Sequence, residues 1–256
     1  MPKSFTQAFD LSDELVLISG GGTGLGFGMA RCLIEVGAQV IIIGRRETIL
    51  QQAVEQLGEA AWYRVHDVTN LEASENLIAS IESDIGRVTT LINNAGHIVK
   101  KPIEETSEKE FELLVKTHVT GSFALSKAVI PSMKAAKRGH ILFTASMASL
   151  FGLPNVIAYA AAKSAFLGMV RSMATELSRD GIRVNAVAPG WIESELLLKT
   201  VEIDPERKQR VLSRTPMGRF GQAEDIGWAV VYLCSPAANF ITGVCLPVDG
   251  GISIGF

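Results

Sequence analysis

The chain has 256 residues, of which 47% are hydrophobic and 20% charged, and its formal net charge at pH 7 is −3. This composition supports a substantial core, and the absence of a polybasic run argues against a nucleic-acid or anionic-membrane partner. No apolar run reaches the length of a transmembrane helix, so no membrane association is expected.

Short runs rich in β-branched residues alternate with longer amphipathic stretches. The predicted strands cover residues 15–19, 39–44, 60–65, 89–93, 140–146, 183–189 and 244–251. The longest helical patterns lie around 108–136 and 157–179. Continuous apolar strands that alternate with helices are typical of a parallel sheet buried on both faces. We therefore predict one Rossmann-type, doubly wound α/β domain over residues 1–256, with about seven strands.

The first predicted strand runs directly into the glycine-rich stretch SGGGTGLG, residues 19–26. A diphosphate must approach bare backbone, and a helix that follows such a turn presents free N–H groups and the positive end of its dipole. The spacing therefore predicts a dinucleotide site, although glycine-rich turns also serve plain chain reversal. The expected contact residues are Gly20, Thr23, Gly24, Leu25 and Gly26. No GK[ST] follows, which argues against an NTPase phosphate loop.

Two arginines, Arg45 and Arg46, follow the second predicted strand, at the position where a dinucleotide's ribose is recognised. An acidic residue there would accept hydrogen bonds from a 2′-hydroxyl, whereas two guanidinium groups suit a 2′-phosphate. The sequence therefore favours NADP over NAD as the cofactor. The alternative is a solvated pair of arginines at the start of a helix.

The stretch YAAAK places Tyr159 and Lys163 four residues apart, on one face of a predicted helix. An adjacent ammonium group would lower the tyrosine pKa and tune the hydroxyl as a proton donor. Ser146 ends a predicted strand at the sheet edge where ligands bind, and its hydroxyl could orient a substrate carbonyl. Taken alone the pattern is weak, because tyrosine and lysine are common on helix surfaces.

Residues 191–216 form the longest segment without a clear pattern, and they carry charges and Pro205. The segment is either an exposed loop or a lid over the site.

The order of these motifs resembles that of the short-chain dehydrogenase/reductase family over nearly the whole chain. The matching stretches are SGGGTGLG, HDVTN, LINNAG, ILFTAS, YAAAK, VNAVAPGWIES, PMGRFGQAEDI and ITGVCLPVDGG. The resemblance implies a doubly wound sheet, NAD(P)-linked alcohol or carbonyl chemistry and a homotetramer.

The resemblance also assigns residues to the site. Ser146, Tyr159 and Lys163 match the catalytic positions, while the cofactor positions are matched by Asp67, Val68, Asn93, Ala95, Gly96, Pro189, Gly190, Ile192 and Ser194. Asp67 could instead cap the following turn, and Asn93 could stabilise the fourth strand. Pro189 and Gly190 would otherwise be an ordinary turn.

His118 departs from the family pattern, because its context KTHVTG usually contains an asparagine at this position. The implied role of that asparagine is to hold a water molecule that links the lysine to solvent. His118 could hold this water, titrate in its place, leave the relay impaired or simply pack in the core. Near the charge of Lys163 we expect its pKa to fall and the imidazole to stay neutral.

The expected function is hydride transfer between NADP(H) and a carbonyl or secondary-alcohol substrate. Lys100 and Lys101 precede a proline after the NNAG turn, as in gluconate 5-dehydrogenases, and could meet the carboxylate of a sugar acid such as 5-ketogluconate; both could equally be solvated. The apolar stretch 150–157 suits a 3-oxoacyl thioester as an alternative substrate. A non-catalytic dinucleotide-binding sensor or scaffold is the competing class.

The cysteines Cys32, Cys234 and Cys245 lie far apart and form neither a CxxC pair nor a zinc-binding spacing. His66, His97 and His140 likewise show no metal-ligand spacing, and the N-terminus has no apolar signal-peptide region. We therefore expect a cytoplasmic protein without a bound metal.

Overall fold

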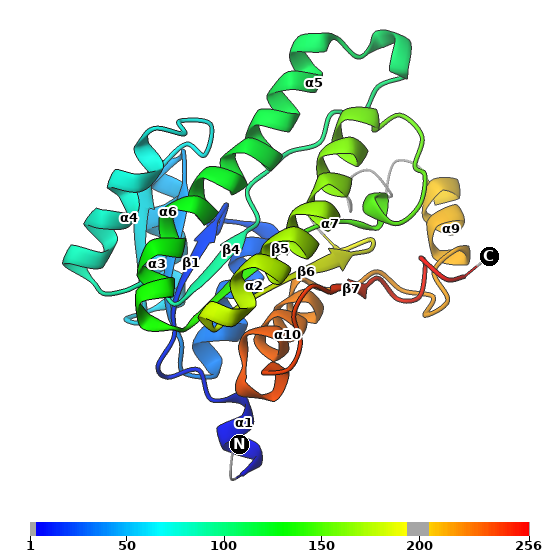
Figure 1. The fold of residues 1–256 in the computed structure, drawn as a ribbon. Coiled ribbons are helices and arrows are strands. Elements are labelled where there is room, and N and C mark those ends of the chain that lie inside the picture. Colours follow the sequence, from blue (N-terminus) through cyan, green and yellow to red (C-terminus); the bar gives the residue numbers. More distant parts are fainter. Residues whose placement is uncertain (1–3, 194–204, 256) are drawn as a thin grey trace.

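The structure of the protein is a computed structural model that describes residues 4–193 and 205–255. A parallel sheet of seven strands forms its centre (Figure 1). The strands are β1 Leu15–Ser19, β2 Gln39–Gly44, β3 Ala61–Val65, β4 Thr90–Asn93, β5 Gly139–Thr144, β6 Ile182–Pro189 and β7 Cys245–Val248. Their order, β3-β2-β1-β4-β5-β6-β7, reverses direction between β1 and β4. The predicted doubly wound fold is confirmed, and ligands bind such sheets where the order reverses.

Helices cover both faces of the sheet. The helices are α1 Phe5–Phe9, α2 Gly24–Glu35, α3 Glu47–Leu57, α4 Ala73–Asp84, α5 Glu108–Val115, α6 Gly121–Ala136, α7 Ile157–Leu177, α9 Pro205–Ser213 and α10 Ala223–Cys234. Buried residues of α4, α6 and α7 share one apolar cluster with the sheet. Buried residues of α2, α3 and α10 form the cluster on the other face. The central strands β1, β4 and β5 are therefore buried at every residue because both faces are covered.

Two predicted elements differ in the structure. The helical pattern 108–136 is divided, since a π-helical turn, Lys116–Thr120, separates α5 from α6. Part of the segment 191–216 is not irregular, because α9 occupies Pro205–Ser213. Proline fits the first turn of a helix, where its missing N–H would have no intrahelical partner. The rest of the expected lid, residues 194–204, lies outside the described residues.

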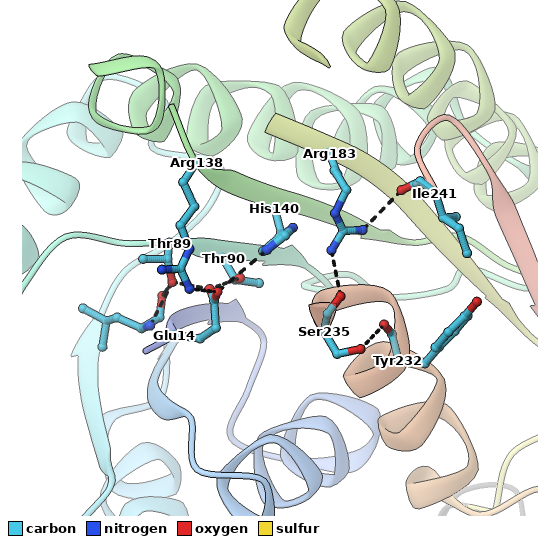
Figure 2. Close-up of polar contacts among 10 residues, drawn as sticks. Glu14, Thr89, Thr90, Arg138, His140, Arg183, Tyr232, Ser235 and Ile241 are labelled. Carbon is cyan, nitrogen blue, oxygen red and sulfur yellow. Dashed lines mark hydrogen bonds and ion pairs between the residues drawn. The ribbon is translucent and has the colours of Figure 1, made fainter. Parts of the chain in front are cut away.

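Charged and polar side chains gather at the amino ends of the central strands (Figure 2). Glu14, which precedes β1, is buried. Its carboxylate accepts hydrogen bonds from Arg138 at 2.5 Å and from the hydroxyls of Thr89 and Thr90 at 2.5 and 2.9 Å. The Nε2 atom of His140 lies 3.8 Å from the same carboxylate. We call these five residues the amino-edge cluster.

The surroundings of the amino-edge cluster shift the pKa values of its buried members. Burial lowers the pKa of His140 to about 4, and the nearby charge of Arg183 acts in the same direction. Burial alone would raise the pKa of Glu14, but three effects outweigh it: attraction to His140 when that ring is protonated, the hydrogen bonds from Thr89 and Arg138, and the charge of Arg138. The pKa of Glu14 is therefore lowered, and near neutral pH the cluster holds a carboxylate beside a neutral imidazole.

Candidate active site

Two turns meet at the carboxyl ends of β1 and β4. The hydroxyl of Ser19 accepts hydrogen bonds from the backbone N–H groups of Asn94 and Ala95, both at 3.0 Å. The side-chain amide of Asn94 in turn donates to the carbonyls of Ser19 and Gly20, at 3.0 and 3.1 Å. The glycine turn and the NNAG turn are therefore one interlocked unit. Neither Ser19 nor Asn94 was predicted as a site residue, although Asn94 directly follows a buried strand beside the sheet's switch point.

The glycines of the first turn leave its backbone open. Gly20 has a φ of +68°, and a Cβ there would come within 2.9 Å of the Ala95 Cα. A Cβ at Gly26 would overlap the Gly20 carbonyl. Gly24, with a φ of +54°, faces open space and is exposed at the start of α2, beside exposed Thr23 and half-buried Leu25. Bare backbone at a helix N-terminus fits the diphosphate of a dinucleotide.

The residues predicted for the adenosine end lie after β2 and β3. Arg45 and Arg46 are both exposed. Asp67 accepts hydrogen bonds from the Thr69 backbone and hydroxyl, at 2.9 and 2.8 Å, so it does cap the following turn. Burial would raise the Asp67 pKa, but these hydrogen bonds and the charge of Arg45 hold it below its usual value. Arg45 and Asp67 thus lie at the same edge of the sheet, beyond the carboxyl ends of β2 and β3. The Val68 side chain is buried.

Asn93 and Asn94 have different roles despite their adjacency. Asn93 is buried, and its amide donates to the Ser126 hydroxyl of α6 at 3.1 Å. The Asn93 side chain therefore links β4 to α6, which agrees with the expected alternative that Asn93 stabilises the fourth strand. Gly96, the last residue of the NNAG turn, is exposed at the edge of the sheet.

Ser146, Tyr159 and Lys163 come together beyond the end of β5. Ser146 begins a 3-10 turn, Met147–Ser149, and its hydroxyl accepts from the Ala148 backbone N–H at 3.1 Å. It also lies close enough to the hydroxyl of Tyr159 to act on the pKa of that group. Lys163 is buried, its Nζ lies 5.7 Å from the centre of the Tyr159 ring, and it donates to the Thr144 carbonyl at 2.6 Å. The hydroxyls and the amine therefore converge on one place.

The pKa of Tyr159 differs from the expectation. Burial raises this pKa above its usual value, because a low-polarity environment disfavours the phenolate, and the nearby Ser146 hydroxyl only partly opposes the effect. The expectation was that the charge of Lys163 lowers the Tyr159 pKa. The Lys163 amine donates to the Thr144 carbonyl instead, and the pKa of Lys163 is itself shifted. Burial lowers the pKa of Lys163 to about 7, so near neutral pH it carries only part of its charge.

His118 lies in the π-helical turn and is buried against the same group. Its ring meets the Tyr159 ring edge-on, with the centroids 5.7 Å apart. Its Nε2 lies 2.8 Å from the His97 carbonyl oxygen. Burial, and secondarily the charge of Lys163, lowers the His118 pKa to about 3. The lowered pKa agrees with the expectation, with burial as the larger cause.

The end of β6 supplies the last predicted contacts. The Gly190 N–H donates to the Val248 carbonyl at 3.1 Å, and a Cβ on Gly190 would crowd Asp249. Pro189 ends the strand, and Ile192 pairs with Gly221 in an isolated bridge. Ser194 lies outside the described residues.

A cavity of about 800 Å³ lies beside the Ser146–Tyr159–Lys163 group. Its lining includes Ala160 and Ser164, which directly follow Tyr159 and Lys163 on α7. The lining also includes four apolar side chains, namely Leu150, Phe151, Leu153 and Ile157. Lys101 also lines the cavity, with its amine in an ion pair with Glu110 at 2.5 Å.

Among the described residues, no helix is both long enough and apolar enough to cross a membrane. Nor do residues 4–193 and 205–255 bring together three histidine, cysteine or acidic side chains in a group that could hold a metal ion.

Known proteins resemble this chain over nearly its full length. The model of a family described as enoyl-(acyl carrier protein) reductase matches residues 20–253. A 3-oxoacyl-[acyl-carrier-protein] reductase of Vibrio cholerae is 35% identical, covering 95% of this chain and 98% of the relative. A protein of Xanthobacter autotrophicus named inactive 2-(S)-hydroxypropyl-CoM dehydrogenase 2 is 38% identical, covering 88% of this chain and 99% of the relative.

A solved structure shows the same architecture. It is a gluconate 5-dehydrogenase from Burkholderia cenocepacia in complex with NADP and tartrate, with a TM-score of 0.93 and 31% sequence identity. The alignment covers 99% of this chain and 100% of that one.

Proposed function

Because the chain belongs to the short-chain dehydrogenase/reductase family, whose members are oxidoreductases acting on CH–OH groups, we propose that it transfers a hydride between NADP(H) and a carbonyl or secondary-alcohol substrate. The convergence of Ser146, Tyr159 and Lys163 beside the open glycine turn carries this proposal. A dinucleotide bound at this edge would supply or accept the hydride.

Each of the three residues has a role that its contacts support. The hydroxyls of Ser146 and Tyr159 lie near each other, so both can hold a substrate oxygen between them. Tyr159 then gives that oxygen its proton during reduction and takes it back during oxidation. Lys163 is held beside the ring by the Thr144 carbonyl, and its charged form favours the phenolate that remains.

The cofactor cradle is formed by the interlocked turns. Gly20, Gly24 and Gly26 with the N-terminus of α2 would hold the diphosphate, and Thr23 and Leu25 border it. Gly96 lies on the NNAG side, and Pro189, Gly190, Ile192 and Ser194 are proposed for the nicotinamide end.

Cofactor choice should depend on Arg45 and Arg46, which are exposed and would face a 2′-phosphate. We expect the parent to bind NADPH more tightly than NADH. Combining Arg45→Ala with Arg46→Ala should weaken NADPH binding by about ten- to hundredfold, from the loss of charge-assisted hydrogen bonds of about 1.5–3 kcal/mol, and should leave NADH binding nearly unchanged. Fluorescence titration with both cofactors measures this.

A matched control removes the same charge elsewhere. Arg87 and Arg179 are exposed and precede β4 and β6, at the opposite edge of the sheet. The Arg87→Ala, Arg179→Ala variant should keep the parent's preference. Equal affinity of the parent for both cofactors would rule out the assigned role of the pair.

Two substrate classes suit the cavity. A sugar acid such as 5-ketogluconate is the first candidate, supported by likeness to a gluconate 5-dehydrogenase solved with tartrate. Lys101 could meet such a carboxylate only by leaving Glu110, and the neighbouring Lys100 is exposed on this segment. The apolar wall formed by Leu150, Phe151, Leu153 and Ile157 favours a 3-oxoacyl thioester as the second candidate.

A substrate panel tests the function. NADPH oxidation should be measured with 5-ketogluconate, acetoacetyl thioesters and neutral cyclic ketones, and we expect turnover of at least one class. Preference for the acidic ketose supports the first candidate, and preference for the thioester supports the second. Tight NADPH binding without turnover of any carbonyl compound would instead support a non-catalytic sensor or scaffold, the class suggested by an inactive relative.

A cytoplasmic homotetramer is part of the same proposal. Exposed apolar side chains include Phe111 and Phe123 on α5 and α6, and Trp228, Phe240 and Ile254 toward the C-terminus. Exposed apolar side chains on several elements suit burial in an assembly. Cys32, Cys234 and Cys245 are all free, as expected in a reducing compartment.

A further inference from the structure

The imidazole of His118 is held between two segments of the site. The π-helical turn Lys116–Thr120 places the ring in the interior, where it is 1% exposed. On one side it meets the edge of the Tyr159 ring. On the other side it contacts the backbone of Gly96 and His97, directly after the NNAG turn. A single-residue π insertion is a common way to turn a side chain toward a functional site.

The hydrogen bonds of His118 assign its tautomer. Nε2 lies 2.8 Å from the His97 carbonyl oxygen and 3.3 Å from the His97 backbone nitrogen. The two contacts require opposite tautomers, because Nε2 would accept from the His97 N–H through its lone pair and would donate to the His97 carbonyl through a proton. We assign the proton to Nε2 because the contact with the carbonyl is the shorter one. Nδ1 then carries the lone pair, and among the described residues it has no hydrogen-bond partner.

Gly96 leaves the space that the ring occupies. A Cβ built on Gly96 would overlap the imidazole, and the three atoms nearest to it all belong to His118. Gly96 does not have a positive φ, so its backbone conformation would otherwise accept alanine. The imidazole ring and Gly96 are therefore complementary in shape. This packing and the hydrogen bond with His97 fix the start of the segment that leads to Lys101 at the cavity.

We propose that His118 is a positioning residue: its Nε2–H bond to the His97 carbonyl and its packing on Gly96 hold the 96–101 segment in place beside Tyr159 as one wall of the substrate site. The proposal rests on the proposed reductase function. An asparagine side chain at this position is one bond shorter from Cβ to its terminal nitrogen, so we expect it not to reach the His97 carbonyl. A glutamine side chain has the same number of bonds as the path to Nε2.

Substitutions at His118 separate this role from a water relay. We expect His118→Gln to keep kcat/KM within about threefold of the parent, whereas His118→Asn and His118→Leu should lose about tenfold or more. Most of that loss should be in KM for the carbonyl substrate, because the displaced segment borders the cavity and Tyr159 stays in place. The pH profile should keep its shape. A His118→Asn variant as active as the parent or better than His118→Gln would overturn the proposal.

A double-mutant cycle on thermal unfolding tests the packing without turnover. Gly96→Ala should lower the melting temperature strongly in the parent, and much less in a His118→Ala background, because the overlapping ring is gone. Gly168→Ala is the matched control: Gly168 is exposed with nothing within 4 Å of its added Cβ, so its effect should be equal in both backgrounds. Equal effects of Gly96→Ala in both backgrounds would also overturn the proposal.

A failure of the positioning role can be distinguished from a failure of the proposed function. If the parent reduces no carbonyl compound, the reductase assignment fails, while the unfolding cycle still reports on the contact between Gly96 and His118. If the parent turns over substrate but Gly96 and His118 show no coupling, only the positioning role fails.

Discussion

Replacing Tyr159 by phenylalanine is expected to lower kcat by on the order of 10²–10⁴-fold, the usual contribution of a positioned proton donor. The substitution removes only the hydroxyl that lies near Ser146. The ring remains to pack against His118, so the pocket should keep its shape and the NADPH dissociation constant should stay within about twofold. Single-turnover NADPH oxidation and fluorescence titration of NADPH measure the two quantities.

A second tyrosine supplies the control for this substitution. Tyr63 lies on β3, at the edge of the sheet, and its hydroxyl bonds to the exposed side chains of Gln51 and Glu47 at 3.1 and 3.2 Å. Tyr63→Phe removes the same atom and should leave kcat nearly unchanged. Substantial turnover in Tyr159→Phe would refute its role as the proton donor, and a matching loss in Tyr63→Phe would show that the effect is not local.

Acidification is expected to destabilise the protein steeply between pH 6.5 and 4.5. An unfolded histidine binds a proton near pH ~6.5, whereas burial lowers the pKa of His140 to about 4 and that of His118 to about 3. Below pH ~6.5 the unfolded state therefore holds protons that the folded state does not, so the free energy of unfolding falls as the pH falls. With two such groups the slope approaches about 3 kcal/mol per pH unit.

The loss of stability from pH 7 to pH 4.5 then totals about 5 kcal/mol, a large share of the about 5–15 kcal/mol typical of a folded domain. Glu14 acts in the same direction at lower pH, because its stabilising contribution disappears as the pH falls through its lowered pKa. Urea unfolding of the cofactor-free protein at several pH values measures the slope. His140→Gln should roughly halve it; a variant slope equal to the parent's would show that His140 is not a source of the acid sensitivity.

The central strands were predictable because apolar residues gather at their centres. β1, β4 and β5 are buried at every residue, and polar residues such as Thr90, Asn93 and His140 stand only toward the strand ends. The end of β7 was less clear: the predicted strand continued to residue 251, but β7 ends at Val248, and Gly250 and Gly251 have positive φ angles beyond it. The π-helical turn was not predictable, since one inserted residue hardly changes the spacing of apolar residues in a long helical pattern.

The site was predictable where spacing alone brings groups together. Tyr159 and Lys163 converge because they are four residues apart on α7, and Ser146 joins them because it lies just beyond the end of β5. The direction of each side chain was not predictable. Lys163 donates to the Thr144 carbonyl, and Asn93 bonds to Ser126 on α6 while Asn94 bonds back to the glycine turn. These contacts depend on how distant elements pack, which no local pattern contains.

The interlock between Ser19 and Asn94 has a consequence for how the protein is made. The two residues are separated by 75 positions in the sequence, so the glycine turn leaves the ribosome well before its partner. Until β4 is synthesised and docks beside β1, the Ser19 hydroxyl lacks the N–H groups it accepts from and the cradle stays incomplete. Such a long-range contact slows assembly, because the chain must close a large loop before the contact stabilises it. A nascent chain that stops before the NNAG turn therefore carries an incomplete cradle, and we expect added nucleotide to bind it poorly.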